Sequence, residues 1–221
     1  MEVQTLLHTH NCSEIPEIFS ENQINQILIT IQNHRYREDG FGDWIKKRNI
    51  AMFMTSYHLA TRPKEVCMLK ISDIDFKNKL IHIPADGNKI HKGRIIAIPS
   101  QLIPFIADYL KTYSYRYWKA SKYLFPSMER GHISRDRWGE IFRDILKESG
   151  IYKAPTRGKH GHYTPYTLRH TKLTQTYLKT KDPHAVANIA GHKSLDCVNT
   201  YVHLASMSLN YLNYMRWALS S

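Results

Sequence analysis

The chain has 221 residues, enough for one domain of ordinary size with a tail, and 42% of them are hydrophobic, which excludes a disordered polymer. Lysine and arginine total 31 against 19 acidic residues, so the net charge is +12, as expected for a binder of polyanions such as nucleic acid. No apolar run reaches the roughly 18 to 20 residues of a membrane span, and the N-terminal residues lack the pattern of a signal peptide.

Most of the sequence has the apolar periodicity of α-helices. Residues 1–17 are expected to form a tail or linker. Ser20 and Gln23 then occupy the positions of a capping box, ahead of apolar residues at helical spacing. Residues 37–43 are expected to end this first helix. The further segments of helical character are 44–59, 64–69, 100–118, 135–148, 167–178, 183–191, a helix that begins after Ser194 and carries Tyr201, and 206–219.

The apolar period changes to two between residues 74 and 98, which indicates β-strands. Residues 74–76 and 80–83 form a predicted hairpin, and 94–98 form a third strand after the turn residues 86–88. The sequence therefore predicts a mainly α fold with one small three-stranded antiparallel sheet (α+β).

Four side chains, far apart in the sequence, supply what metal-free DNA cleavage needs. Fixed cations must neutralise the scissile phosphate, a nucleophile must attack it, and a proton must reach the leaving oxygen. Arg62 lies in ATRPKEV, Arg169 in TLRHT and His192 in AGHKS, and Tyr201 follows nine residues later. Each residue alone is more often part of a surface or a core. A tyrosine nucleophile would keep the energy of the cleaved bond in a phosphotyrosine, so that resealing would need no ATP.

These motifs resemble the catalytic domain of the tyrosine recombinase, or phage integrase, family. The resemblance covers about residues 18–205, and 206–221 would be a C-terminal helix that docks on a neighbouring protomer or folds back. The stretches that carry it are the Arg62 block with Leu69, Asp73, Ile74 and Asp75, the lysine-bearing hairpin ending in Ile98-Pro99, the Leu-Arg-His-Thr motif of 168–171, and the Gly-His-Lys-Ser motif of 191–194 before Tyr201.

The resemblance implies a role for each of the four side chains. Arg62 and Arg169 would clamp the scissile phosphate, and His192 would hydrogen-bond one of its oxygens. Tyr201 would attack phosphorus and form a 3′-phosphotyrosyl intermediate.

The proton-transfer groups are less clearly marked. Lys89, at the strand end before the hairpin turn, is the preferred general acid, with Lys92 as the alternative. Glu65 is expected to orient an active-site group. The family usually has His or Lys three residues before the second arginine, where this chain has Tyr166, and a phenol is a poor base at neutral pH. Slower chemistry or a substitute base is therefore expected.

Further basic side chains are candidates for phosphate contacts along a duplex, with a solvated surface as the alternative for each. They are Lys46, Lys47, Arg48, Lys92, Lys153, Arg157, Lys159 and Lys193. A metal site at His160, His162 and His170 is conceivable, but no cysteine lies close and the surroundings are basic. No metal or other cofactor is predicted.

The predicted function is site-specific DNA recombination: integration, excision, inversion or resolution. The expected partners are double-stranded DNA, a homotetramer formed on it, and accessory DNA-bending proteins, with no membrane. Three dispersed cysteines favour a reducing compartment, so the expected location is the cytoplasm or nucleoid.

Two other functions are open. One is DNA relaxation in the manner of type IB topoisomerases, and the other is an architectural DNA-binding protein with impaired catalysis, which only Tyr166 favours. Most members of the family also carry an N-terminal helical domain. The short leader here fits either a natural single-domain recombinase, like the fimbrial-switch invertases, or a fragment of a longer integrase.

Overall fold

The computed structural model describes residues 17–85, 93–113, 121–127, 131–154, 163–192 and 194–206. In chain order the elements are α1 (Glu21–Asn33), α2 (Gly40–His58), α3 (Pro63–Met68), the 3₁₀ turn η2 (Ile71–Asp73), β1 (Ile74–Asp75), β2 (Leu80–Ile83), β3 (Arg94–Ala97), α4 (Ile103–Tyr113), α5 (Arg135–Glu148), α6 (Pro165–Thr180), α7 (Pro183–Ala190) and the 3₁₀ turn η3 (Leu195–Val198). A helical stretch over 199–206 follows η3. The predicted fold class, mainly α with a small antiparallel sheet, is confirmed.

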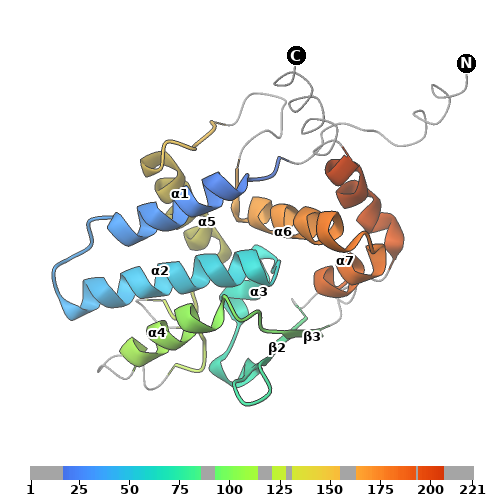
Figure 1. Ribbon diagram of the computed structural model, residues 1–221. Coiled ribbons are helices and arrows are strands. Elements are labelled where there is room, and N and C mark those ends of the chain that lie inside the picture. The colour runs from blue at the N-terminus through green and yellow to red at the C-terminus, as the bar shows by residue number, and fades with distance from the viewer. Residues whose placement is uncertain are drawn as a thin grey trace, which may run out of the picture.

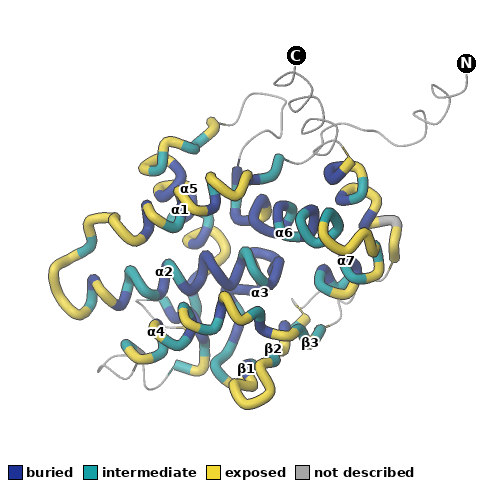
Figure 2. The backbone as a smooth tube through the Cα atoms, in the orientation of Figure 1, coloured by how far each residue is buried: buried dark blue, intermediate teal, exposed yellow. Residues whose placement is uncertain are grey.

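Helix α2 crosses the middle of the molecule and packs against α1, α4 and α6 (Figure 1). Residues 51–56 of this helix are buried on every side, as expected for a helix surrounded by others. Figure 2 shows the buried tube concentrated in the C-terminal part of α2 and in the adjoining α3 and α6. The C-terminal end of α2 therefore lies where several elements meet.

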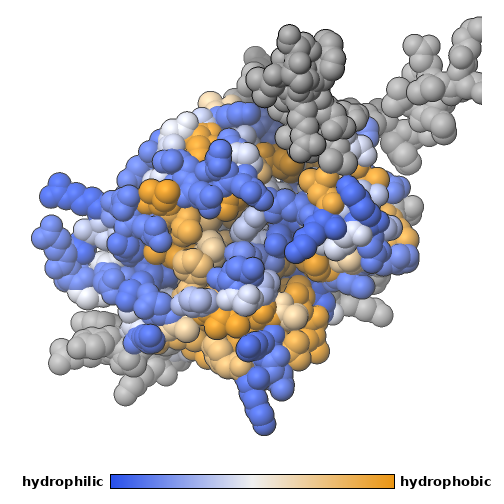
Figure 3. Space-filling model, in the orientation of Figure 1, coloured by the Kyte–Doolittle hydropathy of each residue, from blue (hydrophilic) through white to orange (hydrophobic). Residues whose placement is uncertain are grey.

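The three strands form an antiparallel sheet in the order β1-β2-β3. Ile74, Ile81 and Ile83 are buried and belong to the main core, whereas Ile95 is 69% exposed. The space-filling view shows apolar surface in the region of the sheet (Figure 3). Ile83 pairs with Arg94 at the end of the β2–β3 ladder, so Arg94 is held in place by the strand register.

A second, smaller apolar cluster joins α6, α7 and the helical stretch 199–206. Its buried members are Ala60, Leu173, Val186, Ala187, Ala190, Val198, Tyr201 and Leu204. Tyr201 is therefore placed by packing against α6 and α7, next to the C-terminal end of α2.

Several helix boundaries differ from the prediction because side-chain caps decide them. Asp39 accepts a hydrogen bond from the backbone of Gly42 at 2.8 Å, so α2 begins at Gly40 and the expected break over 37–43 is too long. Thr164 caps α6, which begins at Pro165 and two residues before the predicted start. The expected helix segments 114–118 and 207–219 lie outside the described residues.

The predicted capping box at the start of α1 is confirmed. The Ser20 backbone donates to Gln23 Oε1 at 2.9 Å, and the Gln23 backbone donates to Ser20 Oγ at 3.2 Å. In the described part of the chain, no helix is long and apolar enough to cross a membrane.

Candidate active site

Arg62 lies at the start of α3, where Pro63 is the first helical residue. Its Nη1 donates to Glu65 Oε1 at 2.7 Å, and its backbone N–H donates to Glu65 Oε2 at 2.7 Å. Only 7% of Arg62 is exposed. One carboxylate, the one expected to orient an active-site group, therefore fixes both the main chain and the guanidinium of Arg62.

Arg169 projects from α6 into the interior and is 1% exposed. Its Nη1 donates to the carbonyl of Ala60 at 2.6 Å and its Nη2 to that of Ala190 at 2.7 Å. Burial lowers the pKa of Arg169, and the charge of Arg62 lowers it further, so the two cations lie close together. Two closely placed guanidinium groups make a strong site for a phosphate anion.

His192 follows the end of α7. Gly191 ends this helix with φ of +67°, a conformation that favours glycine, and the His192 backbone donates to the Ala187 carbonyl at 3.0 Å. This turn directs the imidazole towards Arg169, whose Nη2 lies 3.2 Å from His192 Nε2. The turn therefore connects the end of α7 to the guanidinium pair.

Tyr201 is 5% exposed and lies between two imidazole rings. Its ring centroid lies 6.3 Å from that of His192 and 5.8 Å from that of His170. Burial raises the pKa of the Tyr201 phenol, while the charges of Arg169 and Arg62 oppose the rise. Without DNA, the phenol is therefore neutral at pH 7, within range of the guanidinium pair.

Tyr166 and His170 lie beside Tyr201 on successive turns of α6. Tyr166 is 41% exposed, and its ring centroid lies 5.8 Å from that of His170. Burial lowers the pKa of His170 to about 4, and the nearby Arg169 contributes to the shift. Its Nδ1 is buried without a hydrogen-bond partner among the described residues. His170 is thus a neutral imidazole between the two phenols.

Arg94 is a member of this group that the sequence did not indicate. Its guanidinium donates to both carboxylate oxygens of Glu65, at 2.9 and 3.0 Å, and its Nε donates to the carbonyl of Ile189 at 2.8 Å. An arginine at the start of a short strand gives no sequence signal of such contacts, because Glu65 and Ile189 are brought to it only by the tertiary fold.

Five expected site residues lie outside the described part of the chain: Lys89, Lys92, Arg157, Lys159 and Lys193. The described ends of the lysine hairpin are Ile83 and Arg94, which pair with each other. Roles for the five residues therefore stay predictions from the sequence.

The basic residues of α2 lie away from the guanidinium pair. Lys46 is roughly 20 Å along the helix from its C-terminal end. The Nζ of Lys47 contacts Asp43 at 3.3 Å and Asp108 at 3.5 Å. Arg48 is only 6% exposed and donates to the side chain of Asn49, so the expectation of a surface cation at Arg48 is wrong.

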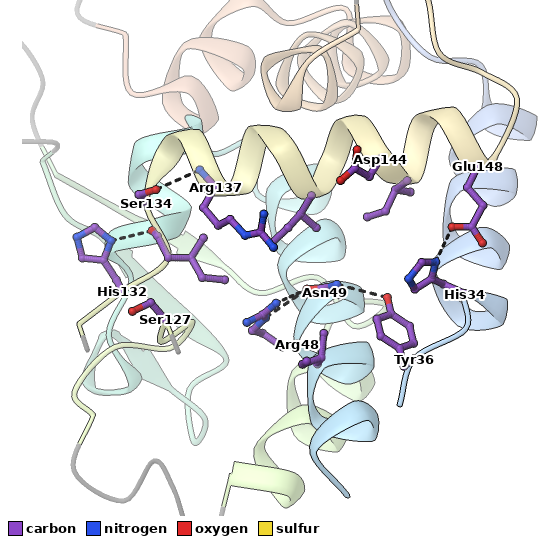
Figure 4. Close-up of a pocket in the computed structure, with 14 residues that line it drawn as sticks. His34, Tyr36, Arg48, Asn49, Ser127, His132, Ser134, Arg137, Asp144 and Glu148 are labelled. Atoms are coloured by element: carbon purple, nitrogen blue, oxygen red, sulfur yellow. Dashed lines mark hydrogen bonds and ion pairs between the residues drawn. The ribbon is translucent and has the colours of Figure 1, made fainter. Parts of the chain in front are cut away.

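One cavity lies away from this group of residues. It has a volume of about 890 Å³ between α2, α5 and the end of α1 (Figure 4). Arg48, Asn49 and Tyr36 form a hydrogen-bonded row along one side of it. Burial lowers the pKa of Arg48 to about 10, and its guanidinium lies 5.0 Å from the Trp44 ring. This cation is therefore held by an amide and an aromatic ring.

A second cavity is lined by Pro63, the residue after Arg62, and by Tyr166. It has a volume of about 830 Å³ and lies between α5 and the start of α6. Three basic residues of α5 line it as well, Arg135, Arg143 and Lys147, together with the acidic Asp136 and Glu140.

Within the described residues, no group of three His, Cys, Asp or Glu side chains has the arrangement of a metal site. His160 and His162, the other members of the metal site considered from the sequence, lie outside this part of the chain. That alternative is therefore not tested by the described geometry.

Comparisons with curated proteins connect this arrangement to known relatives. The chain is 29% identical over 192 residues to tyrosine recombinase XerH of Campylobacter jejuni, an alignment that covers 86% of this chain and 49% of XerH. It is 28% identical over 195 residues to tyrosine recombinase XerA of Pyrococcus furiosus, covering 88% of this chain and 60% of XerA. The chain thus spans about half the length of these relatives.

Solved structures share the fold. A crystal structure of XerA recombinase superposes with a TM-score of 0.72 and 24% identity, over 96% of this chain and 67% of that one. XerH site-specific recombinase, bound to palindromic difH substrate in a post-cleavage complex, gives a TM-score of 0.72 and 19% identity over 90% of this chain and 53% of that one. The family model described as "Phage integrase family" matches residues 17–207. This chain belongs to the phage integrase family.

Proposed function

We propose that this chain carries the catalytic domain of a site-specific DNA recombinase that cleaves DNA through a 3′-phosphotyrosyl intermediate at Tyr201. The observation that carries the proposal is the convergence on one buried phenol: Tyr201 stacks on His192, whose Nε2 lies 3.2 Å from Arg169. Arg62 is close enough for its charge to lower the pKa of both Arg169 and Tyr201. A phosphate at this point would meet two guanidinium groups, an imidazole and a nucleophile.

The reaction would begin when the phosphate displaces water from the guanidinium pair. Arg62 and Arg169 neutralise the charge on its non-bridging oxygens, and His192 hydrogen-bonds one of them. The Tyr201 oxygen bonds to phosphorus while its proton passes to a water molecule, and the bond to the 5′ oxygen breaks. Lys89, or else Lys92, gives that oxygen a proton. Attack by the 5′ hydroxyl of a second strand reverses the step and frees Tyr201.

The chain differs from the usual family pattern at the position expected to assist proton removal from Tyr201. Tyr166, which stands where a histidine or lysine is usual, has its ring centroid 5.8 Å from that of His170. His170 is neutral and contacts Tyr201. We assign Tyr166 the role of a hydrogen-bond donor at the phosphate. Neither the phenol of Tyr166 nor the buried imidazole of His170 is a strong base, so slow cleavage is expected.

The duplex would lie over the surface around the cavity between α5 and α6. Arg143 and Lys147, which line this cavity, would contact backbone phosphates. Solved relatives include XerH bound to difH DNA, and double-stranded DNA is the partner proposed here. Assembly of four protomers on DNA, accessory DNA-bending proteins and a location at the nucleoid are parts of the same proposal.

The test begins by selecting bound sequences from a random duplex library, since the target site is unknown. A nicked suicide duplex built on the selected site is then incubated with the protein in EDTA and run on a denaturing gel. A covalent adduct that disappears in Tyr201→Phe supports phosphotyrosine chemistry independent of metal. A clear gel shift without any adduct would contradict the proposal.

An architectural DNA-binding protein is the second candidate, and Tyr166, in place of the usual histidine or lysine, favours it. That protein would bend or bridge the selected duplex without cutting it. DNA relaxation is distinguished by its product: a topoisomerase acts on a plasmid without a second site, whereas a recombinase exchanges strands between two selected sites. The adduct assay and the two-site assay together separate the three functions.

A further inference from the structure

Arg94 is the first residue of β3, and the strand register pairs it with Ile83. Its side chain is only 8% exposed and points away from solvent into the junction between the sheet, α3 and α7. Burying a guanidinium costs free energy unless its N–H groups have hydrogen-bond acceptors. The acceptors of Arg94 therefore show which parts of the structure it connects.

One set of partners lies on the Arg62 side. Arg94 Nη1 and Nη2 donate to the two oxygens of Glu65 at 2.9 and 3.0 Å, a two-pronged contact that fixes the plane of the carboxylate. The same carboxylate accepts from the side chain and the backbone of Arg62. Burial would raise the pKa of Glu65, but the hydrogen bonds and charge of Arg94, followed by those of Arg62, lower it overall. Glu65 is therefore an ionised bridge between two arginines.

The other set of partners lies on the His192 side. Arg94 Nε donates to the carbonyl of Ile189, in the last turn of α7. A Cβ added at Gly191 would lie only 3.0 Å from Arg94 Cδ. The Arg94 side chain therefore packs directly against the turn that follows α7. This turn places His192 next to Arg169.

We propose that Arg94 is a positioning residue for DNA cleavage, which fixes Arg62 and His192 relative to each other across one phosphate. The proposal rests on the proposed function. Arg94 thus donates hydrogen bonds both to Glu65 and to the last turn of α7. Misplacement of a phosphate-binding group by ~1 Å costs on the order of 100-fold in rate. A lysine at this position could not replace Arg94, because its ammonium group lacks the planar pair of N–H donors of the guanidinium.

The experiment uses the full chain with Arg94→Lys and Arg94→Gln, on the selected suicide duplex. Single-turnover cleavage at saturating DNA, the Kd for the duplex, and the folded fraction by near-ultraviolet circular dichroism are measured at one temperature. Rates are normalised to the folded fraction. We expect cleavage to fall on the order of 100-fold in both variants while the Kd changes by less than about threefold. Arg37→Lys, at an exposed arginine that pairs with Asp39, is the matched control.

A double-mutant cycle tests whether Arg94 affects the cleavage rate through His192. If Arg94 acts through the placement of His192, then Arg94→Lys should cost much less in a His192→Asn background than in the wild type. Equal costs in both backgrounds overturn the proposal, as does a variant that cleaves within about threefold of wild type. A loss that disappears on normalisation to the folded fraction also overturns it. Absence of an adduct with the wild-type protein instead contradicts the proposed function.

Discussion

The environment of Tyr201 keeps its phenol neutral at pH 7. The side chain is 5% exposed between two imidazole rings, and burial raises its pKa. A phosphate bound to Arg62 and Arg169 would offer the phenol an electrophile at the same moment as it partly neutralises the two cations. The nucleophile is therefore protected against accidental ionisation, and its activation depends on a group that removes the proton during attack.

Tyr166→Phe tests whether the phenol at the unusual position takes part in cleavage. Removing its hydroxyl should slow single-turnover cleavage at saturating DNA by about tenfold or more, because one hydrogen bond to the phosphate is lost. Tyr177→Phe, on the same helix and packed in the second apolar cluster, is the control and should cleave at the wild-type rate. An unchanged rate for Tyr166→Phe would remove this residue from the site.

His170 makes the stability of the protein depend on pH. Its pKa is about 4 in the folded chain, below the value near ~6.5 of an unburied histidine. The unfolded chain therefore binds a proton that the folded chain lacks between these pH values, and stability falls as pH decreases through this window. From pH 7 to pH 5, the loss from this one residue is on the order of 2 kcal/mol.

His170→Phe should remove that part of the acid sensitivity. The free energy of unfolding, from denaturant titrations at pH 7 and pH 5, should fall less in His170→Phe than in the wild type. His58, whose pKa burial also lowers to about 4, remains in both proteins and leaves a residual dependence. A pH dependence identical to that of the wild type would show that the pKa of His170 is the same in the folded and the unfolded chain.

At the scale of the element, the turn that carries His192 depends on Gly191. Gly191 and Gly150 both have a positive φ, of +67° and +71°, and both follow a helix. An alanine at either position costs about 1 kcal/mol of backbone strain. Only at Gly191 would the new Cβ meet another side chain, because Arg94 Cδ lies 3.0 Å away and nothing lies within 4 Å at Gly150.

Gly191→Ala should therefore lower the cleavage rate beyond its effect on stability, whereas Gly150→Ala should lower stability alone. Thermal unfolding of both variants and single-turnover cleavage at a temperature where both are folded separate the two effects. Equal cleavage by the two variants would mean that the turn tolerates displacement of Arg94, and that His192 is positioned by other contacts.

The elements were predictable where local side-chain caps define them. Helix α5 has the predicted bounds because Ser134 caps it and Gly150 follows it. Helix α2 begins earlier than predicted, because Asp39 caps a start that contains two glycines, and glycines suggest a break. The arginine, histidine and tyrosine motifs pointed to one site because their order matches a family pattern. The contacts of Arg94 and the burial of Arg48 arise from tertiary packing, which sequence periodicity does not record.

At the scale of the molecule, charge and site geometry have separate effects on DNA. A net charge of +12 favours binding to any duplex, and this contribution weakens as salt increases. In the proposed function the site at Tyr201 acts on one phosphate, which the charge alone cannot select. Assays of specific cleavage and of synapsis therefore belong at about 0.15 M salt, where the Debye length is short and unspecific attraction is reduced.

The C-terminal residues 207–221, outside the described structure, are predicted to contribute to assembly rather than to binding of one site. Their sequence is apolar at Leu209, Leu212 and Trp217, and the family resemblance implies docking on a neighbouring protomer. A chain that ends at Ser206 should bind a single selected site with a Kd within about threefold of the full chain and should lose the slow-moving two-site complex on native gels. The triple substitution Leu209→Ser, Leu212→Ser and Trp217→Ser keeps the length and should have the same effect. If either variant instead fails to fold, as judged by circular dichroism and thermal unfolding, the segment packs on its own domain and the assembly role is wrong.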